Sequence, residues 1–563
     1  MNQQYPIYTE KNDCRDCYKC VRHCPVKAIK IENGRAAVIP ERCIACGLCV
    51  HTCPAGAKKV RNDLTRTKNL LERHTKVVAS IAPSYVSEWP GIDPAAMAGA
   101  LKQLGFSAAS ETALGAEAVT HALARTLEHA RPGLHISTAC PVVVDHIRKY
   151  RPEFTANLTP LLSPMQTHAN LLKKQLGPDT AVVFIGPCIA KKCESDEFDG
   201  FTDIALTFKE LKAWFEERGI DPYAAQPADF EPGKAQHGAI YPLAGGMNKT
   251  LEAYPLGSVE LLAMSGLEAI FQTLENLDTA ALQAPVFLEA LACPGGCIGG
   301  PQTTARQALL AGELAVRKTS SSQCPDATAV AVAFTFEPGP PPSSTPAESE
   351  IRAALERVGK FRIDDELNCG GCGYETCRNF AEALINNKAE PDMCLSYLRK
   401  QAQKKANALL HSIPSGVVIA DASLRVIECN ENFARLAGPE TVLGYEARPG
   451  LEGADLRKIL PFAQLFDEVN RSGKKYRTDT LRFEERLLKV TIFPIEPGKT
   501  VGGTLLDVTQ TEYRREHIAR QAREVIEKNM ATVQDIACRL GEHMADTEIL
   551  LRSIADDYAD ASE

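Results

Sequence analysis

The centre of the chain alternates between short apolar runs and longer stretches with helical spacing. Residues 77–81, 181–185 and 239–243 are apolar and rich in strand-forming residues, which is typical of buried strands. Residues 94–104 and 116–130 have the pattern of helices. Because strands that alternate with helices form parallel sheets with crossover connections, this pattern predicts an α/β body.

The pattern changes after this body. Residues 337–350, EPGPPPSSTPAESE, combine proline, serine and acidic residues and are too polar to build a core, so they predict a linker. Further along, a two-residue periodicity predicts strands, with a short helix at 431–437. The expected strands are 415–421, 425–430, 475–483, 486–493 and 502–507.

The last part of the chain, from residue 509, has the pattern of one long helix. Apolar residues recur there in alternating steps of four and three, which is typical of a coiled-coil seam and predicts a homodimer. The seam residues are Ile526, Met530, Val533, Ala537, Leu540, Met544, Thr547, Leu551 and Ile554. The alternative is a helix packed on the preceding domain, because Ala537 and Thr547 weaken the stripe. Either way the tail has no room for a kinase or phosphatase domain.

Length and charge narrow the class of protein. A chain of 563 residues exceeds one core, so several domains are expected. The net charge of -8 offers no basic footprint for nucleic acid. No apolar run is long enough to span a membrane, and residues 1–10 lack the pattern of a secretory signal, so a cytoplasmic location is expected.

The 20 cysteines change this picture most, because without a signal peptide they indicate metal ligands rather than disulfides. Sixteen fall into tight motifs. The singles, read as ordinary buried or surface thiols, are Cys193, Cys324, Cys429 and Cys538.

The first motifs form a doubled C-x2-C-x2-C-x3-C-P pattern, in which the fourth cysteine of each run binds the other cluster. One 4Fe-4S cluster is therefore expected on Cys14, Cys17, Cys20 and Cys53, and a second on Cys43, Cys46, Cys49 and Cys24. Zinc is the alternative. This segment resembles the bacterial two-cluster ferredoxins.

After the linker, a C-x2-C-x4-C-x16-C pattern predicts one more 4Fe-4S cluster, again with zinc as the alternative. Its ligands would be Cys369, Cys372, Cys377 and Cys394. This segment resembles small 4Fe-4S modules of corrinoid iron-sulfur proteins and electron-transport subunits.

The body contains three separated cysteine motifs, STACP (137–141), GPCIAKKCE (186–194) and EALACPGGCIGG (289–300). Each follows an expected strand, at the sheet edge where α/β proteins keep their sites. Spacing alone predicts one further cluster.

Together these motifs resemble the catalytic domain of the FeFe-hydrogenases over residues 75–320. The resemblance implies that Cys140, Cys188, Cys293 and Cys297 bind the cubane of an H-cluster. It also implies that Cys297 bridges to a two-iron subunit with carbonyl and cyanide ligands. Lys191 then hydrogen-bonds one cyanide, and the backbone around Pro83 and Ser84 contacts the other.

The chain also departs from that family. Ala139 replaces a cysteine that relays protons, and Leu123 and Thr126 stand where the relay carries glutamates. Gly186 and Leu291 replace two methionines. Because alanine carries no proton, slow turnover is expected. The alternative is a structural iron-sulfur protein that has lost the two-iron unit, but Lys191 would then have no clear role.

The strand pattern of the tail resembles a PAS domain, a signal-transduction module. The whole sequence predicts a multidomain α/β hydrogen sensor that reacts with H2 and relays electrons to the PAS module and a downstream signalling protein. The alternatives are a ferredoxin-coupled hydrogenase and a non-catalytic electron-transfer protein. The expected parts are a two-cluster domain (1–62), an H-cluster domain (75–336), the linker (337–350), a 4Fe-4S module (351–400), an α+β PAS domain (401–510) and the final helix (511–563).

Overall fold

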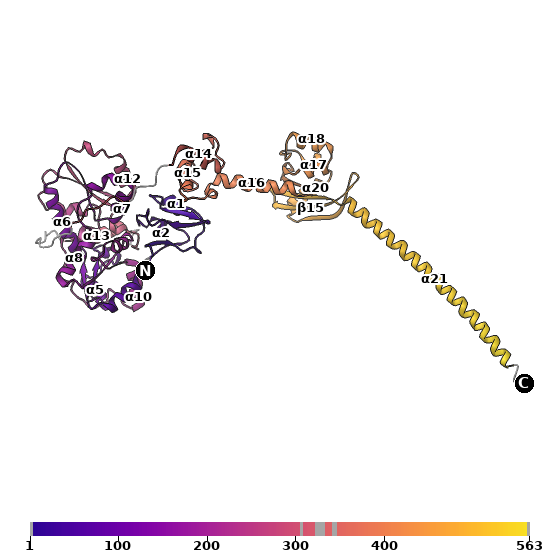
Figure 1. Ribbon diagram of the computed structural model, residues 1–563, viewed down its shortest axis with the longest axis horizontal. Helices are drawn as coiled ribbons and strands as arrows, with labels where there is room; N and C mark the ends of the chain where they lie inside the picture. Colours follow the sequence, from indigo (N-terminus) through magenta and orange to yellow (C-terminus); the bar gives the residue numbers. More distant parts are fainter. Residues whose placement is uncertain (1–3, 305–307, 321–332, 340–345, 560–563) are drawn as a thin grey trace. The chain divides into compact units, whose positions relative to one another are not determined.

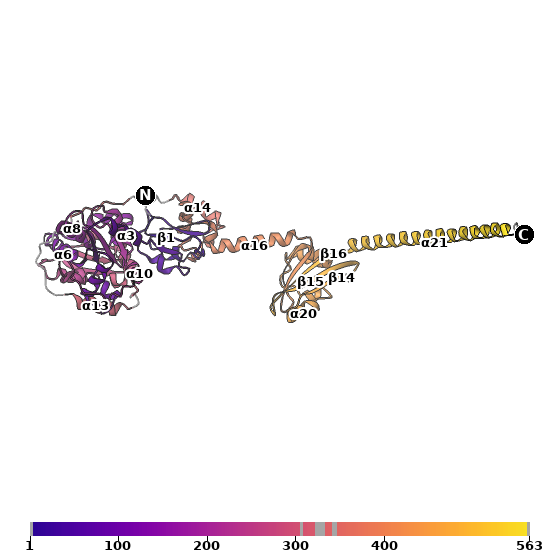
Figure 2. The same cartoon turned by 90° about the horizontal axis from the view of Figure 1, so that it is seen from below.

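The computed structural model describes residues 4–304, 308–320, 333–339 and 346–559. These residues form two compact units, Met1–Leu398 and Arg399–Glu563. Figures 1 and 2 show the elements of both units. The single cysteine Cys324 and residues 340–345 of the expected linker lie outside the described residues.

The first 60 residues form a small domain of paired short strands and two short helices. Strand β1 (Ile7–Thr9) pairs with β4 (Lys58–Val60), and β2 (Ile29–Glu32) pairs with β3 (Arg35–Val38). The helices are α1 (Lys19–His23) and α2 (Leu48–Thr52). Each helix carries one cysteine and ends just before another, so the repeat in the sequence becomes a repeat in the structure.

The body contains two parallel sheets, as the alternating pattern predicts. One has the order β6-β5-β8-β9 and the other β10-β11-β7. Their strands are β5 (Val77–Ile81), β6 (Ala108–Glu111), β7 (Gly133–Ile136), β8 (Ala181–Gly186), β9 (Ile204–Thr207), β10 (Glu260–Ser265) and β11 (Pro285–Leu291). Strands β5 and β8 are buried at every residue, which explains their unbroken apolar sequence.

Helices cover these sheets, and α5 and α6 lie where the sequence predicts helices (Figure 1). Asp93 accepts a hydrogen bond from the Ala95 amide and Pro94 occupies the first turn, which explains where α5 begins. The helices are α4 (Tyr85–Glu88), α5 (Pro94–Gln103), α6 (Ala113–Glu128), α7 (Pro141–Tyr150), α8 (Pro164–Leu176), α9 (Ala190–Glu197), α10 (Phe208–Arg218), α11 (Gly246–Leu251), α12 (Leu267–Asn276) and α13 (Leu309–Thr319).

One expected strand, at residues 239–243, is wrong. The chain forms the short 3-10 helix His237–Ile240 there and then turns toward α11. Pro242 lacks an amide hydrogen and cannot donate to a sheet ladder. Only Leu243 makes an isolated bridge, to Gly296, so this apolar run is buried as a loop that lines the site described below.

A buried ion network fixes helix α9 to the start of α3 (Leu64–Arg73). Lys192 is fully buried, and its ammonium donates to Asp63 at 2.8 Å and to Glu210 at 2.9 Å. A buried charge is tolerated only when it is paired and hydrogen-bonded, as here. The network therefore holds the helix that carries the neighbouring Lys191.

His168 is buried between two strands of the first sheet. Its Nδ1 lies 2.8 Å from the Ser80 hydroxyl and its Nε2 lies 3.0 Å from the Ser110 hydroxyl. Burial lowers the pKa of His168 to about 3, so the ring is neutral in the folded protein. The unfolded chain binds a proton near pH 6.5, and the folded chain does not.

Acid should therefore destabilise this domain through His168. Below pH 6.5 the unfolded state binds more protons than the folded state, so the free energy of unfolding falls as pH falls. The contribution of His168 to this free energy is complete only above pH 6.5. Between pH 7.5 and pH 5 we expect the wild type to lose about 2 kcal/mol more than H168Q. Urea unfolding followed by tryptophan fluorescence measures this, because Trp89 and Trp214 both lie in this core. Equal pH dependence of the two proteins would contradict the prediction.

Residues 346–398 form a small helical module. It contains α14 (Glu348–Arg357), α15 (Cys377–Ile385) and the start of α16 (Leu395–Ser412). Asn368 accepts a hydrogen bond from the Cys377 amide, and Thr376 caps α15 by accepting from the Asn379 amide. The expected ligands thus lie in a turn, at a helix start and just before the next helix.

The second unit contains an antiparallel sheet of order β13-β12-β16-β15-β14 and the helix α21 (Thr509–Ala559). The predicted strands and the predicted short helix are all present. The strands are β12 (Gly416–Asp421), β13 (Val426–Cys429), β14 (Tyr476–Phe483), β15 (Arg486–Glu496) and β16 (Thr500–Asp507), and the helices of the domain are α17 (Glu431–Ala437), α18 (Pro439–Ala447), α19 (Leu456–Ile459) and α20 (Gln464–Ser472).

Helix α21 extends from this sheet as a single helix (Figure 2). Residues 513–555 are all exposed. The apolar stripe is therefore not packed on the preceding domain, which was the alternative to a coiled coil. In the part of the chain that the structure describes, no helix combines the length and apolar character needed to cross a membrane.

Candidate functional site

Three cysteines from distant parts of the body line one pocket. Cys140, Cys188 and Cys297 contribute to a cavity of about 100 Å³. They follow strands β7, β8 and β11, so their loops meet at the carboxyl ends of the two sheets. The pocket is where the sequence predicts the H-cluster.

The loop between Cys293 and Cys297 requires two glycines. Gly295 and Gly296 have φ values of 74° and 94°, in the left-handed region. A Cβ on Gly296 would lie 2.2 Å from the Pro242 carbonyl oxygen. Glycine alone therefore permits the turn that brings the Cys297 amide to the same carbonyl, at 2.7 Å.

These thiols are partly buried and lie close to one another. Burial raises the pKa of Cys188 to about 11 and that of Cys297 to about 12, and in both cases negative charge on Cys140 raises it further. Lys191 acts in the opposite direction on both. Because metal binds the thiolate, loading this site must release protons.

Lys191 reaches the same pocket from the first turn of α9. Its ammonium donates to the Ser163 hydroxyl at 2.9 Å and to the Glu194 carboxylate at 2.6 Å. The Ser163 hydroxyl also donates to Glu194. The carbonyl oxygen of Ala139 lies 3.5 Å from the ammonium. Lys191 is thus a positioned cation on the wall of the pocket, with its charge balanced by one buried carboxylate.

The loop after β5 forms another wall. Pro83 and Ser84 line the pocket, and Ser84 is 1% exposed. Among the described residues, the Ser84 hydroxyl finds no hydrogen-bond partner. Because buried hydroxyls are normally hydrogen-bonded, this one suits a bound acceptor in the pocket.

The rest of the wall is apolar. Ala139 lines the pocket where a proton-relaying cysteine would stand, and Leu291 lines it as well. At Gly186, a Cβ would lie 2.6 Å from the ring of Phe184. Phe184 therefore fills space that a side chain at Gly186 would need, and it lines the pocket too.

Sequence reasoning missed several lining residues, namely Met165, Phe184 and Tyr241, and also the Ser163 and Glu194 partners of Lys191. Only Glu194 carries a signal in the sequence, because a residue three positions after Lys191 lies on the same helix face. Leu123 and Thr126, the two aligned relay positions, do not line the pocket.

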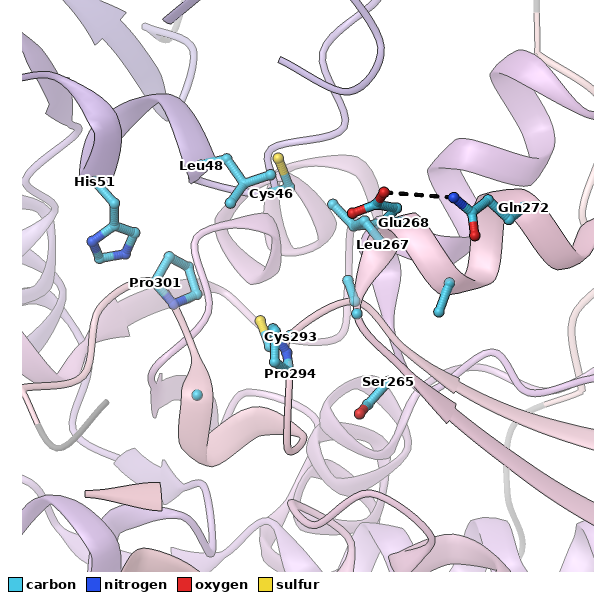
Figure 3. A pocket seen from close by; sticks show the side chains of 14 residues that line it. Cys46, Leu48, His51, Ser265, Leu267, Glu268, Gln272, Cys293, Pro294 and Pro301 are labelled. Atoms are coloured by element: carbon cyan, nitrogen blue, oxygen red, sulfur yellow. Dashed lines mark hydrogen bonds between the residues drawn. The ribbon is translucent and has the colours of Figure 1, made fainter. Parts of the chain in front are cut away.

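Cys293 faces a different space, a pocket of about 490 Å³ that it shares with Cys46 of the N-terminal domain (Figure 3). Leu48, Pro294 and Pro301 also line it. The domains touch here, because a Cβ on Gly47 would lie 2.6 Å from Pro301. The second N-terminal cysteine group therefore adjoins the loop of Cys293.

The eight N-terminal cysteines form two groups with crossed membership. Burial raises the pKa of Cys20, and nearby Cys14, Cys17 and Cys53 raise it further. Burial likewise raises the pKa of Cys49 well above its ordinary value, with further increases from Cys43, Cys46 and Cys24. Each group thus takes its fourth cysteine from the other run, in the arrangement that two clusters require.

In the module, Cys372 lies near Cys369 and Cys394, whose charges add to the effect of burial in raising its pKa. Among the described residues, no three His, Cys, Asp or Glu side chains are placed to hold one metal ion. A cubane differs from a single ion because each thiolate binds a different iron.

Four separate segments of the chain match known families. Residues 75–301 match the family described as iron only hydrogenase large subunit, C-terminal domain. Residues 6–54 match the 4Fe-4S dicluster domain, residues 365–396 an Fe-S cluster family, and residues 405–477 the PAS domain.

Individual relatives are distant. The periplasmic [Fe] hydrogenase large subunit of Nitratidesulfovibrio vulgaris is 27% identical over 359 residues, covering 52% of this chain and 85% of the relative. The solved [FeFe]-hydrogenase HydA1 from Chlamydomonas reinhardtii is 18% identical, with a TM-score of 0.38, covering 46% of this chain and 90% of that one. The PAS domain of nitrogen regulation protein NR(II) from Vibrio parahaemolyticus is 14% identical, with a TM-score of 0.15, covering 18% of this chain and 96% of that one.

Proposed function

We propose that this chain, which joins a segment similar to the iron only hydrogenase large subunit to 4Fe-4S segments and a PAS domain, is a hydrogen sensor of the FeFe-hydrogenase family with weak hydrogenase activity. One observation carries the proposal. Cys140, Cys188 and Cys297 converge with Lys191 on a single pocket.

The residues present fit an H-cluster. We assign Cys140, Cys188, Cys293 and Cys297 to its cubane, with Cys297 as the bridge to the two-iron unit. The buried hydroxyl of Ser84, which has no partner in the described part of the chain, and the cation of Lys191 are the donors that an anionic cyanide-bearing group needs. Phe184 and Met165 give the same space an apolar lining.

When bound, such a cofactor splits H2 into two protons and two electrons. The chain supplies the surroundings for that chemistry. Lys191 holds a positive charge toward the pocket, and Glu194 and Ser163 fix its position. Ala139 can neither accept nor donate a proton, so protons leave slowly and turnover is low.

Electrons would leave through the other clusters. We assign one 4Fe-4S cluster to Cys14, Cys17, Cys20 and Cys53, a second to Cys43, Cys46, Cys49 and Cys24, and a third to Cys369, Cys372, Cys377 and Cys394. The shared pocket of Cys46 and Cys293 supports transfer between the H-cluster and the second cluster.

The signalling half of the proposal rests on the PAS domain and α21. Thirteen large apolar side chains of α21, from Tyr513 to Ile554, are exposed, which supports pairing of two chains along this helix. A change in cluster charge would bias the arrangement of the PAS domain and its helix, and a downstream signalling protein would detect it. We place the protein in the cytoplasm, where a reduced ferredoxin could also exchange electrons with it.

Infrared spectroscopy tests the cofactor. After maturation with the two-iron unit, the protein should show carbonyl and cyanide stretching bands that disappear when the unit is withheld. If these bands are absent in matured protein with intact 4Fe-4S clusters, the protein would instead be a non-catalytic electron-transfer protein. Hydrogen oxidation as fast as that of standard hydrogenases would instead favour the ferredoxin-coupled enzyme.

A further inference from the structure

The module with the last four expected ligands is bound to the N-terminal domain through helix α1. Arg22 of α1 donates one hydrogen bond to the Cys17 carbonyl at 3.0 Å and another to the Gly371 carbonyl at 3.2 Å. One guanidinium thus joins the backbone of two cysteine loops, and Arg22 and Gly371 are 349 positions apart in the sequence.

Lys27 makes a second link at the end of the same helix. Its ammonium donates to the carbonyls of Val21 at 3.4 Å and Arg22 at 3.2 Å, and to the Gly373 carbonyl at 3.0 Å. A cation is stabilised by the carbonyl end of a helix. The Lys27 ammonium therefore connects the carbonyl end of α1 to the module.

A third link lies beside the helix. The Glu390 carboxylate accepts from the Asn33 amide at 2.6 Å and from the Gly34 amide at 3.1 Å, and the Ile31 amide donates to the Lys388 carbonyl at 2.9 Å. These bonds tie the module to the β2–β3 hairpin. The module is therefore fixed in orientation as well as in position.

The surfaces also fit closely. A Cβ on Gly373 would lie 3.0 Å from a methyl group of Val21, so only glycine allows this approach. Val21, Cys20, Cys24 and Tyr374 belong to one buried apolar cluster. Helix α1 carries Cys20 of one N-terminal group and ends just before Cys24 of the other, and its Val21 packs against Gly373, next to Cys372.

We propose that the module and the N-terminal domain form one electron-transfer unit. Electrons pass from the N-terminal clusters to the module cluster beside helix α1, where the positive charge of Lys27 favours the reduced state of the adjacent clusters. This inference rests on the proposed function. Each transfer oxidises one N-terminal 4Fe-4S cluster and reduces the module cluster by one electron, with no proton moved. The electrons come from H2, which yields two electrons and two protons.

The first test uses a pair of glycines in the full-length matured protein. Gly373→Gln inserts a side chain toward α1, whereas Gly359→Gln adds the same side chain at another left-handed glycine of the module, with no atom within 4 Å of its Cβ. Backbone strain is thus similar in both variants. After mixing with H2, the module cluster should be reduced about tenfold more slowly in G373Q, which is about 1.4 kcal/mol of barrier, and at the wild-type rate in G359Q.

The second test removes charge. Lys27→Met should shift the reduction potential of the adjacent clusters to more negative values, because a nearby cation favours the added electron. Lys11→Met removes the same charge from an exposed side chain of the same domain, where solvent screens it, and should shift the potentials less. Potentiometric electron paramagnetic resonance also reports whether the reduced clusters interact magnetically.

The outcomes separate this inference from the proposed function. Infrared bands and H2-dependent reduction of the N-terminal clusters in every variant would show that the hydrogenase site is loaded. Suppose that the module cluster is then reduced equally fast in G373Q and G359Q, and that K27M shifts no reduction potential. Electron transfer at α1 would be wrong, whereas the proposed hydrogen-sensor function would stand. If dithionite-reduced wild type shows no magnetic interaction with the module cluster, the inference also fails.

Discussion

In Lys191→Met, the carbonyl and cyanide infrared bands should be lost or strongly reduced after maturation, while the signals of the 4Fe-4S clusters remain. Methionine keeps much of the length of lysine but donates no hydrogen bond. The anionic two-iron unit would keep one covalent tether and lose its only cationic partner among the lining residues. We expect at least about a tenfold loss of the bound unit, as for other contacts that orient a metal site.

Two comparison variants make this result specific. Removing Lys191 leaves the Glu194 carboxylate without its cation, at a cost of about 3 to 5 kcal/mol for a buried pair. The double variant Lys191→Met with Glu194→Gln removes that cost and should still lack the bands. Lys209→Met, at an exposed position of α10, should behave as the wild type. Bands of wild-type intensity and frequency in K191M would contradict the assignment of Lys191.

The variant Ala139→Cys should oxidise hydrogen about 10 to 100 times faster than the wild type, because a thiol restores a proton-transferring group at the wall of the pocket. This gain lies at or below the low end of the usual range for general acid-base catalysis, since Leu123 and Thr126 supply no carboxylates to continue a proton path beyond position 139. Turnover with an artificial electron acceptor measures the effect without involving the PAS domain.

Ala139→Ser is the control for this second prediction. Serine has nearly the size of cysteine, but its hydroxyl ionises far less readily, so its rate should stay near that of the wild type. If the wild type is already as fast as A139C, protons leave by a route that does not need position 139. The argument for a sensor with low turnover would then fail.

The cysteine motifs and the parallel sheets could be predicted because both depend on local information. Ligand spacing is set by the cofactor, and the unbroken apolar sequence of β5 and β8 reflects burial on both faces. The strand predicted at 239–243 is wrong because apolar composition indicates burial and does not distinguish a strand from a buried loop. Pro242 within it was the available warning.

The contacts between distant parts could not be predicted from the sequence. Phe184 fills the space beside Gly186 because β8 ends at the pocket, which is a property of the assembled sheet. Arg22 and Gly371 have no shared pattern, although they are hydrogen-bonded across 349 positions. Long-range pairs of this kind depend on complementary surfaces, and local periodicity carries no information about them.

The exposed helix α21 is long enough to amplify small rotations at its first turn. Its 51 residues span about 77 Å at about 1.5 Å per residue. A change of direction of about 10° at its first turn would move its far end by about 13 Å, from simple geometry on that length. A rearrangement too small to alter the PAS sheet itself would therefore be large at the distance where a partner could detect it.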